Sequence, residues 1–131
     1  MSLPDLFSRW FASRGWAPRA HQLALVDLAR QGKSALLIAP TGGGKTLAGF
    51  LPTLVELNER ATKPQRLVST GKEVRRSGGL HTLYISPLKA LAVDIARNLE
   101  TPVREMGLPI RIETRTGDTP SSKRQRQRRD P

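Results

Sequence analysis

The 131-residue sequence predicts an α/β fold built around a parallel sheet. Short apolar runs bounded by turn residues alternate with longer segments whose apolar residues recur at helical spacing, which is typical of βαβ units. The run at 34–39 is also continuously apolar after Ser34 instead of alternating with polar residues, as expected for a strand covered on both faces. The predicted order of elements is α-α-β-α-β-α-β.

Two helices are expected before the first strand. In residues 5–14, large apolar side chains recur on one helical face, and Gly15 ends the helix. A second helix continues to Gly32 and has Pro18 in its first turn, where the missing N–H does no harm.

The remaining elements alternate strand and helix. Each of the two long helices contains a proline, which should bend it because one hydrogen bond is lost. Leu88, Leu91, Ala92, Ile95, Ala96 and Leu99 form the predicted buried stripe of the second. The expected elements are a strand at 34–39, a helix at 45–60 with Pro52, a strand at 80–85, a helix at 88–106 with Pro102, and a strand at 110–114.

The length of the chain is that of one domain. Differences in composition and pattern divide the sequence into five units. These are the N-terminal helices at 1–33, a glycine-loop unit at 34–60, a basic loop at 61–79, a second strand–helix unit at 80–119, and a basic tail at 120–131 that could also be a helix.

The formal net charge is +11, from 22 basic and 11 acidic residues. The excess is concentrated in residues 61–79 and 120–131, each of which holds five basic residues against one acidic residue. Such clusters favour binding to a polyanion, with nucleic acid the expected partner. Solvated loops that are basic without binding anything are the alternative.

Several protein classes are excluded by composition. No apolar run is long enough to span a membrane, and the N-terminus lacks the pattern of a secretory signal, so no membrane association is expected. The absence of cysteine excludes disulfides and thiolate chemistry, and fits a reducing cytoplasm.

Residues 39–46 form the segment most suggestive of chemistry. They fit the phosphate-binding pattern G-x-x-x-x-G-K-[ST], except that Ala39 replaces the first glycine. Backbone N–H groups of such a loop converge on phosphates, Lys45 would reach the β- and γ-phosphates, and Thr46 would offer its hydroxyl to Mg²⁺. The alternative is a glycine-rich turn that carries a lysine. The candidate phosphate-binding residues are Thr41, Gly42, Gly43, Gly44, Lys45 and Thr46.

This loop resembles motif I of superfamily 2 helicases, the DEAD/DEAH-box group, in which alanine commonly stands first. Upstream, residues 16–22 are similar to the adenine-reading Q motif of that group. The resemblance implies that Gln22 hydrogen-bonds the adenine edge and that Arg19 lies against the ring. The alternative for Gln22 is an exposed helix residue, and Trp10 and Trp16 are interpreted as packing residues.

Two further segments extend the resemblance. Residues 86–92 resemble motif Ia, which contacts the backbone of the tracked strand, and residues 116–120 stand where the family has a second strand-contacting glycine loop. Together they look most like the large helicase-related group, which includes ligase-associated DNA-repair DExH helicases. Lys89 could instead be a solvated lysine, and Asp118 could simply shape a turn. The nucleic-acid contacts implied by the resemblance are Ser86, Pro87, Leu88, Lys89, Gly117, Asp118 and Thr119.

The resemblance implies part of the first RecA-like domain of an ATP-dependent DNA helicase, with ATP and Mg²⁺ as cofactors and Lys45 as a catalytic residue. Single-stranded nucleic acid, with DNA favoured, and a second RecA-like domain are the implied partners. No Asp-Glu-x-His follows by Pro131, so the Walker B carboxylates are missing and this chain alone is expected to be inactive. The alternatives are a non-catalytic module that binds nucleic acid or nucleotide, and a small P-loop kinase, for which neither lid nor acceptor site is found.

Overall fold

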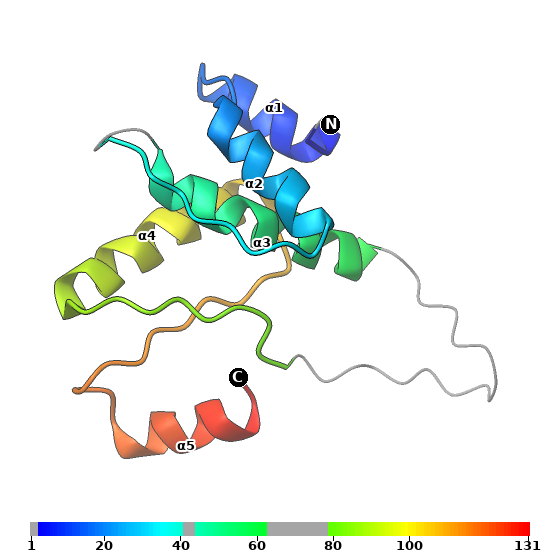
Figure 1. The fold of residues 1–131 in the computed structure, drawn as a ribbon. Helices are drawn as coiled ribbons and strands as arrows, with labels where there is room; N and C mark the ends of the chain where they lie inside the picture. The colour runs from blue at the N-terminus through cyan, green and yellow to red at the C-terminus, as the bar shows by residue number, and fades with distance from the viewer. Residues whose placement is uncertain (1–2, 41–43, 63–78) are drawn as a thin grey trace, which may run out of the picture.

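The structure is a computed structural model that describes residues 3–40, 44–62 and 79–131. These residues form five α-helices joined by irregular segments (Figure 1). The helices are α1 (Asp5–Ser13), α2 (Ala20–Arg30), α3 (Lys45–Thr62), α4 (Lys89–Met106) and α5 (Ser121–Arg129). None of the helices in these ranges is long and apolar enough to cross a membrane.

The predicted parallel sheet is absent from the described residues, so the predicted α/β fold class is wrong for this structure. The segments 34–39, 80–85 and 110–114 have the expected positions between helices, but they are irregular. Leu36 and Ile38 in the first segment are each 86% exposed, and Ile85 in the second is 81% exposed.

The physical reason is that an apolar run reveals only which side chains avoid water. A strand also needs a neighbouring backbone that takes its N–H and C=O groups. Within the described residues, the three segments form no backbone hydrogen bonds with one another. The second and third segments instead line a cavity of about 510 Å³ between α3 and α4.

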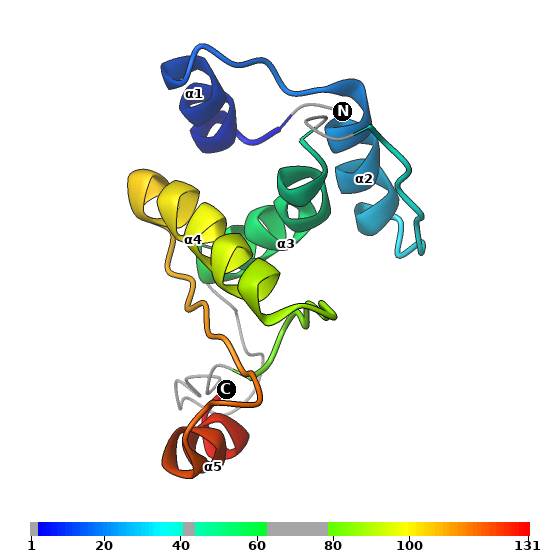
Figure 2. The ribbon, with the colours of Figure 1, turned by 90° about the vertical axis from the view of Figure 1, so that its left-hand side faces the viewer.

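The core lies where α1, α2 and α3 meet the C-terminal end of α4. Helix α2 packs along α3, and α4 contacts both α1 and α3, as Figure 2 shows. Apolar side chains recurring on one face of each helix supply this contact. The buried core residues are Leu3, Phe7, Trp10, Phe11, Val26, Leu51, Leu54, Val55 and Leu108.

The helix ends follow local chemistry. Gly107 has φ +63° directly after α4, a left-handed conformation that glycine adopts at low cost. Pro18 was expected in the first turn of the second helix, but α2 begins at Ala20 with Arg19 as its N-cap, so Pro18 lies before the helix. Pro52 and Pro102 both lie inside their helices, as predicted.

The predicted buried stripe of α4 is only partly buried. Leu99 is buried, because this end of α4 packs against the core, whereas Leu88 and Leu91 are exposed. The exposed residues lie at the N-terminal end of α4, before the part of the helix that contacts the core. The predicted sheet was expected to cover this end. Because the predicted strands are absent, the predicted burial of the first half of the α4 stripe is wrong as well.

Candidate functional site

A buried amide joins the start of α2 to the start of α3. Gln22 is 3% exposed. Its Oε1 accepts a hydrogen bond from the backbone N–H of Arg19 at 2.8 Å, and its Nε2 donates to the carbonyl of Gly44 at 3.3 Å. The alternative of an exposed helix residue at position 22 is therefore wrong. Gln22 fixes the glycine that precedes the helix of the candidate phosphate-binding loop.

Gly44 is a position where an added side chain would displace the Gln22 amide. Its φ is +73°, and a Cβ atom added to it would lie 2.8 Å from the Nε2 atom of Gln22. Its carbonyl also accepts a hydrogen bond from the N–H of Ala48 at 3.0 Å, as expected for the residue that directly precedes α3. Glycine is thus required both by backbone conformation and by the close approach of Gln22.

A cavity of about 700 Å³ opens beside this contact. Trp16, Arg19, Gln22, Gly44 and Thr46 line one side of it. Its far side is formed by α4, through Asn98, Leu99, Thr101 and Pro102. The volume lies in the range of small-molecule sites, which is about 300–1,000 Å³. The predicted adenine-contacting residues and the start of α3 therefore share one cavity.

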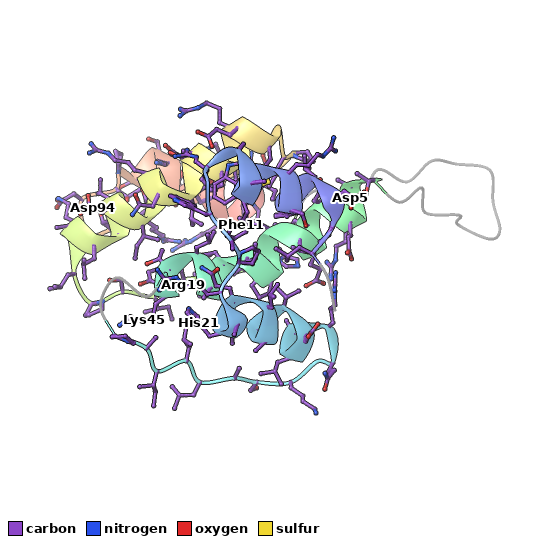
Figure 3. All side chains as sticks on the ribbon, turned by 90° about the horizontal axis from the view of Figure 1, so that it is seen from above. Asp5, Phe11, Arg19, His21, Lys45 and Asp94 are labelled. Atoms are coloured by element: carbon purple, nitrogen blue, oxygen red, sulfur yellow. The ribbon has the colours of Figure 1, made fainter. Side chains whose placement is uncertain are left out.

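Lys45 and Thr46 are the first two residues of α3, and both are exposed. The N–H groups at a helix start are free of intrahelical partners and favour an anion. Figure 3 shows Arg19, His21 and Lys45 gathered at the same end of α2 and α3, with Asp94 apart from them on α4. This end of the two helices suits a negatively charged ligand.

Three of the predicted phosphate-binding residues, Thr41, Gly42 and Gly43, lie outside the described residues. Among the described residues, the start of α3, with the Lys45 ammonium and the Thr46 hydroxyl, is chemically suited to a nucleotide. The described residues include no group of three or more histidine and acidic side chains that could hold a metal ion.

An aromatic and arginine cluster forms the outer wall of the cavity. The Arg14 guanidinium lies 5.8 Å from the ring centroid of Trp10 and 5.5 Å from that of Trp16, within cation–π range. Arg14 also pairs with Glu105 of α4, and the Trp10 indole N–H donates to Glu105 at 2.7 Å. These hydrogen bonds, from Arg14 first and then Trp10, hold the pKa of Glu105 below its ordinary value.

Trp16 was interpreted as a packing residue, but half of its side chain is exposed. Both tryptophans line the cavity, but Trp16 is 52% exposed, whereas Trp10 is 7% exposed and belongs to the core. Sequence reasoning missed Arg14 and Glu105 because their contact joins residues that lie 91 positions apart. Apart from charge, nothing in the local sequence pattern marks this pair.

The two segments implied to contact nucleic acid lie next to each other. Lys89, at the start of α4, forms an ion pair with Asp118. Both side chains are largely exposed, so the pair contributes little to stability. Ser86, Pro87 and Leu88 precede α4 directly, and the Ser86 hydroxyl lies 3.5 Å from the Leu88 carbonyl oxygen.

Residues 116–119 form a turn closed by threonine side chains. The Thr119 N–H donates to the Thr116 carbonyl at 3.2 Å, and the Thr116 N–H donates to the Thr119 hydroxyl oxygen at 2.8 Å. Asp118 shapes this turn through its N–H, which donates to the Thr116 hydroxyl at 3.3 Å, while its carboxylate pairs with Lys89. Asp118 therefore both shapes the turn and pairs with a lysine.

The basic tail forms a helix, α5, that is fixed to the preceding segment. Arg126 pairs with Glu113, and the Gln127 side-chain amide donates to the Thr114 carbonyl at 3.1 Å. Arg111 pairs with Asp130 at 3.0 Å, and this hydrogen-bonded pair lowers the pKa of Asp130. Part of the tail's positive charge is thus paired within the chain.

Comparison with known proteins gives a family and several relatives. The family model described as DEAD/DEAH box helicase matches residues 19–130. The chain is 40% identical over 91% of its length to a Mycolicibacterium smegmatis protein named Lhr helicase/probable uracil glycosylase. It is 38% identical over 98% of its length to the Escherichia coli Lhr helicase/uracil glycosylase, and 36% identical over 98% to the Thermococcus barophilus ATP-dependent helicase Lhr-Core protein 2.

The chain spans 8%, 9% and 15% of the lengths of these three relatives, respectively. No solved structure matches the chain. The predicted resemblance to DEAD/DEAH-box helicases of the large helicase-related type is confirmed by the family match and by the names of these relatives.

Proposed function

The chain belongs to the DEAD/DEAH box helicase family, and we propose that its 700 Å³ cavity binds ATP·Mg²⁺ as part of an ATP-dependent DNA helicase. The observation that carries this proposal is the Gln22–Gly44 hydrogen bond, at the junction of the cavity and α3. It joins a residue implied to read adenine to the loop implied to hold phosphate.

Gln22 can serve both partners at once. A glutamine amide has two N–H donors and two acceptor lone pairs, and the bonds to Arg19 and Gly44 use one of each. One donor and one acceptor therefore remain for an adenine edge. In the proposal, the Arg19 side chain lies against the base.

The phosphate end of the proposed site uses charge and open backbone donors. Thr41, Gly42, Gly43 and Gly44 supply N–H groups, Lys45 neutralises the β- and γ-phosphates, and Thr46 contacts Mg²⁺. When bound, Mg²⁺ would supply positive charge that offsets the charge of the phosphates. Lys45 is the catalytic residue of this proposal, since it would touch the reacting phosphate.

The proposed nucleic-acid contact uses the residues around the Lys89–Asp118 pair. Ser86, Pro87, Leu88 and Lys89 on one side, and Gly117, Asp118 and Thr119 on the other, would grip the phosphates of a single strand, DNA being favoured. Asp118 repels phosphate, so a strand that binds Lys89 must displace or share the carboxylate. The location proposed is the cytoplasm, where ATP and nucleic acid are both available.

In the complete protein, a second RecA-like domain would close on the nucleotide and drive movement along the strand. The sequence units proposed for this chain are 1–33 around Gln22, 34–60 around the phosphate loop, 61–79 as a basic loop, 80–119 around Lys89, and 120–131 as the basic tail. ATP hydrolysis belongs to this complete assembly, because phosphoryl transfer depends on all the parts that position the phosphate and the water.

Titration calorimetry with ATP·Mg²⁺ tests the nucleotide site. The unchanged chain should bind weakly, and Lys45→Ala should abolish the binding because it removes the main side-chain cation at the phosphates. Lys33→Ala is the matched control: Lys33 is also exposed, but it does not lie at the start of α3. Equal affinity of the unchanged chain and Lys45→Ala would disprove the assignment.

A further inference from the structure

Arg124 reaches from α5 to the turn at residues 116–119. Its Nη2 atom donates to the carbonyl of Thr116 at 2.9 Å and to the carbonyl of Gly117 at 2.8 Å. Its Nε atom is buried and has no hydrogen-bond partner within the described residues. This guanidinium is therefore directed at the backbone of the turn, although it belongs to a helix that is basic along its whole length.

The two carbonyls fix the direction of a neighbouring N–H group. In a trans peptide the C=O and the following N–H point in opposite directions. Because the Thr116 carbonyl points at Arg124, the N–H of Gly117 points away from it. That N–H donates to no backbone or side-chain acceptor in the described ranges.

Gly117 also leaves space in front of this N–H. A Cβ atom added at Gly117 would meet no atom within 4 Å, and the residue is exposed. Neither packing nor a positive φ therefore requires glycine here. An absent side chain at an open N–H permits the close approach of a phosphate oxygen.

Other residues of α5 are fixed along the same segment. Gln127 donates to the Thr114 carbonyl at 3.1 Å, and Arg126 pairs with Glu113. By contrast, the side chains of Arg128 and Arg129 are exposed and form no hydrogen bond or ion pair within the described part of the chain. The basic residues of α5 thus divide into those that hold the segment at 113–117 and those that face solvent.

We propose that Arg124 is a positioning residue, which holds the turn at 116–119 so that the Gly117 N–H and the adjoining Lys89 meet the phosphates of a single strand. The inference rests on the proposed nucleic-acid contact. It assigns to Arg124 a role different from that of a phosphate-binding cation, although both roles are consistent with a basic tail.

Hydrogen exchange of the free 131-residue chain gives the first test, because it needs no nucleic acid. The amides of Asp118 and Thr119 donate within the turn and report its order. In Arg124→Ala these amides should exchange about tenfold faster, since two charge-assisted bonds to the turn are lost. Amides in the middle of α3 should be unchanged, which shows that the variant remains folded. Unchanged exchange at Asp118 and Thr119 overturns the proposal.

A salt titration on a labelled single-stranded DNA, followed by fluorescence anisotropy, gives the second test. Each cation that neutralises a phosphate adds about 0.7 to the slope of log affinity against log salt. Arg124→Ala should weaken binding several-fold while keeping the slope within about 0.2 of that of the unchanged chain. The matched control Arg128→Ala should flatten the slope by about 0.7. A flattening by Arg124→Ala equal to that of the control overturns the proposal.

Arg124→Lys keeps the charge but replaces the planar guanidinium by a shorter-reaching ammonium. It should restore less than half of the lost exchange protection and of the lost affinity. Full recovery of affinity without recovery of protection would mean that only the charge matters, and overturns the proposal. If the unchanged chain binds no single strand, the proposed nucleic-acid contact fails, and the exchange measurement still decides whether Arg124 holds the turn.

Discussion

At the scale of single residues, Gln22 and Gly44 form the contact on which the candidate nucleotide site depends. Gln22 is buried with both ends of its amide bonded, and Gly44 has a backbone conformation and a neighbour that disfavour a side chain. The pair fixes the start of α3 relative to α2. Substitutions at these two positions should therefore affect stability and nucleotide binding together.

Gly44→Ala should be more destabilising than an equivalent change elsewhere. A left-handed φ costs an alanine about 1–2 kcal/mol, and here the new methyl group also meets Gln22. Gly32→Ala is the control, because Gly32 has φ +67° but no atom within 4 Å of an added Cβ. Denaturant unfolding should give a larger loss for Gly44→Ala. Equal losses in the two variants would argue against a restrictive Gln22 contact.

Glu105 should make stability depend on pH. Arg14 and then Trp10 lower the pKa of Glu105 in the folded chain, so its contribution is present above the ordinary glutamate pKa of about 4.3. The contribution is lost as the pH falls through the lower folded-state pKa. Thermal unfolding of Glu105→Gln should therefore depend less on pH between about 5 and 3 than that of the unchanged chain. Identical pH dependence would contradict the role of this carboxylate.

At the scale of elements, the helices could be predicted from sequence and the sheet could not. Helical spacing of apolar residues located α3 at its observed start and α4 within one residue of it, because that pattern is local. The predicted strands at 34–39, 80–85 and 110–114 were wrong because strand formation depends on a partner backbone, which the side-chain pattern does not specify.

The candidate site shows the same limit. Gln22 and the loop ending at Thr46 could be predicted as candidates from short motifs. In the structure, Gln22, Gly44 and Thr46 line one cavity. The pairing of Lys89 with Asp118, 29 residues apart, could be expected only from the family resemblance. The hydrogen bonds of Arg124 to the turn could not be predicted, because a run of arginines does not indicate which side chains contact the rest of the chain.

Helix α5 should contribute fewer phosphate contacts than its charge suggests. Arg124 and Arg126 are bonded within the chain, whereas Arg128 and Arg129 are exposed. Changing Arg128 and Arg129 together to alanine should flatten the salt dependence of single-strand binding by about 1.4 units. Adding Arg126→Ala should flatten it by less than a further 0.7 or so. A full additional step for Arg126 would contradict its pairing with Glu113.

At the scale of the whole molecule, the exposed apolar segments dominate the expected behaviour. Leu36, Ile38, Leu83 and Ile85 all expose most of their side chains, on segments whose backbone groups form no sheet within the described residues. Such surface is an aggregation hazard.

The isolated chain should therefore self-associate. Sedimentation velocity should give a weight-average mass that rises with concentration. Replacing Leu36 and Ile38 with serine should reduce this rise, because it removes two of the most exposed apolar side chains. Ala12→Ser, at an exposed position of α1, is the control. A buried residue such as Leu51 is unsuitable, because its replacement would disturb the core. A monomer with a sharp, reversible melt would contradict this expectation.

The central claim is that the cavity beside Gln22 and Gly44 binds nucleotide, and NMR spectroscopy tests it most directly. ATP·Mg²⁺ should shift the side-chain amide signals of Gln22 and the indole signal of Trp16, which line the cavity. The side-chain amide signals of Asn58, which lies on α3 outside the cavity lining, should move less. Lys45→Ala should remove these shifts. Shifts confined to α5, or shifts that persist unchanged in Lys45→Ala, would contradict the claim.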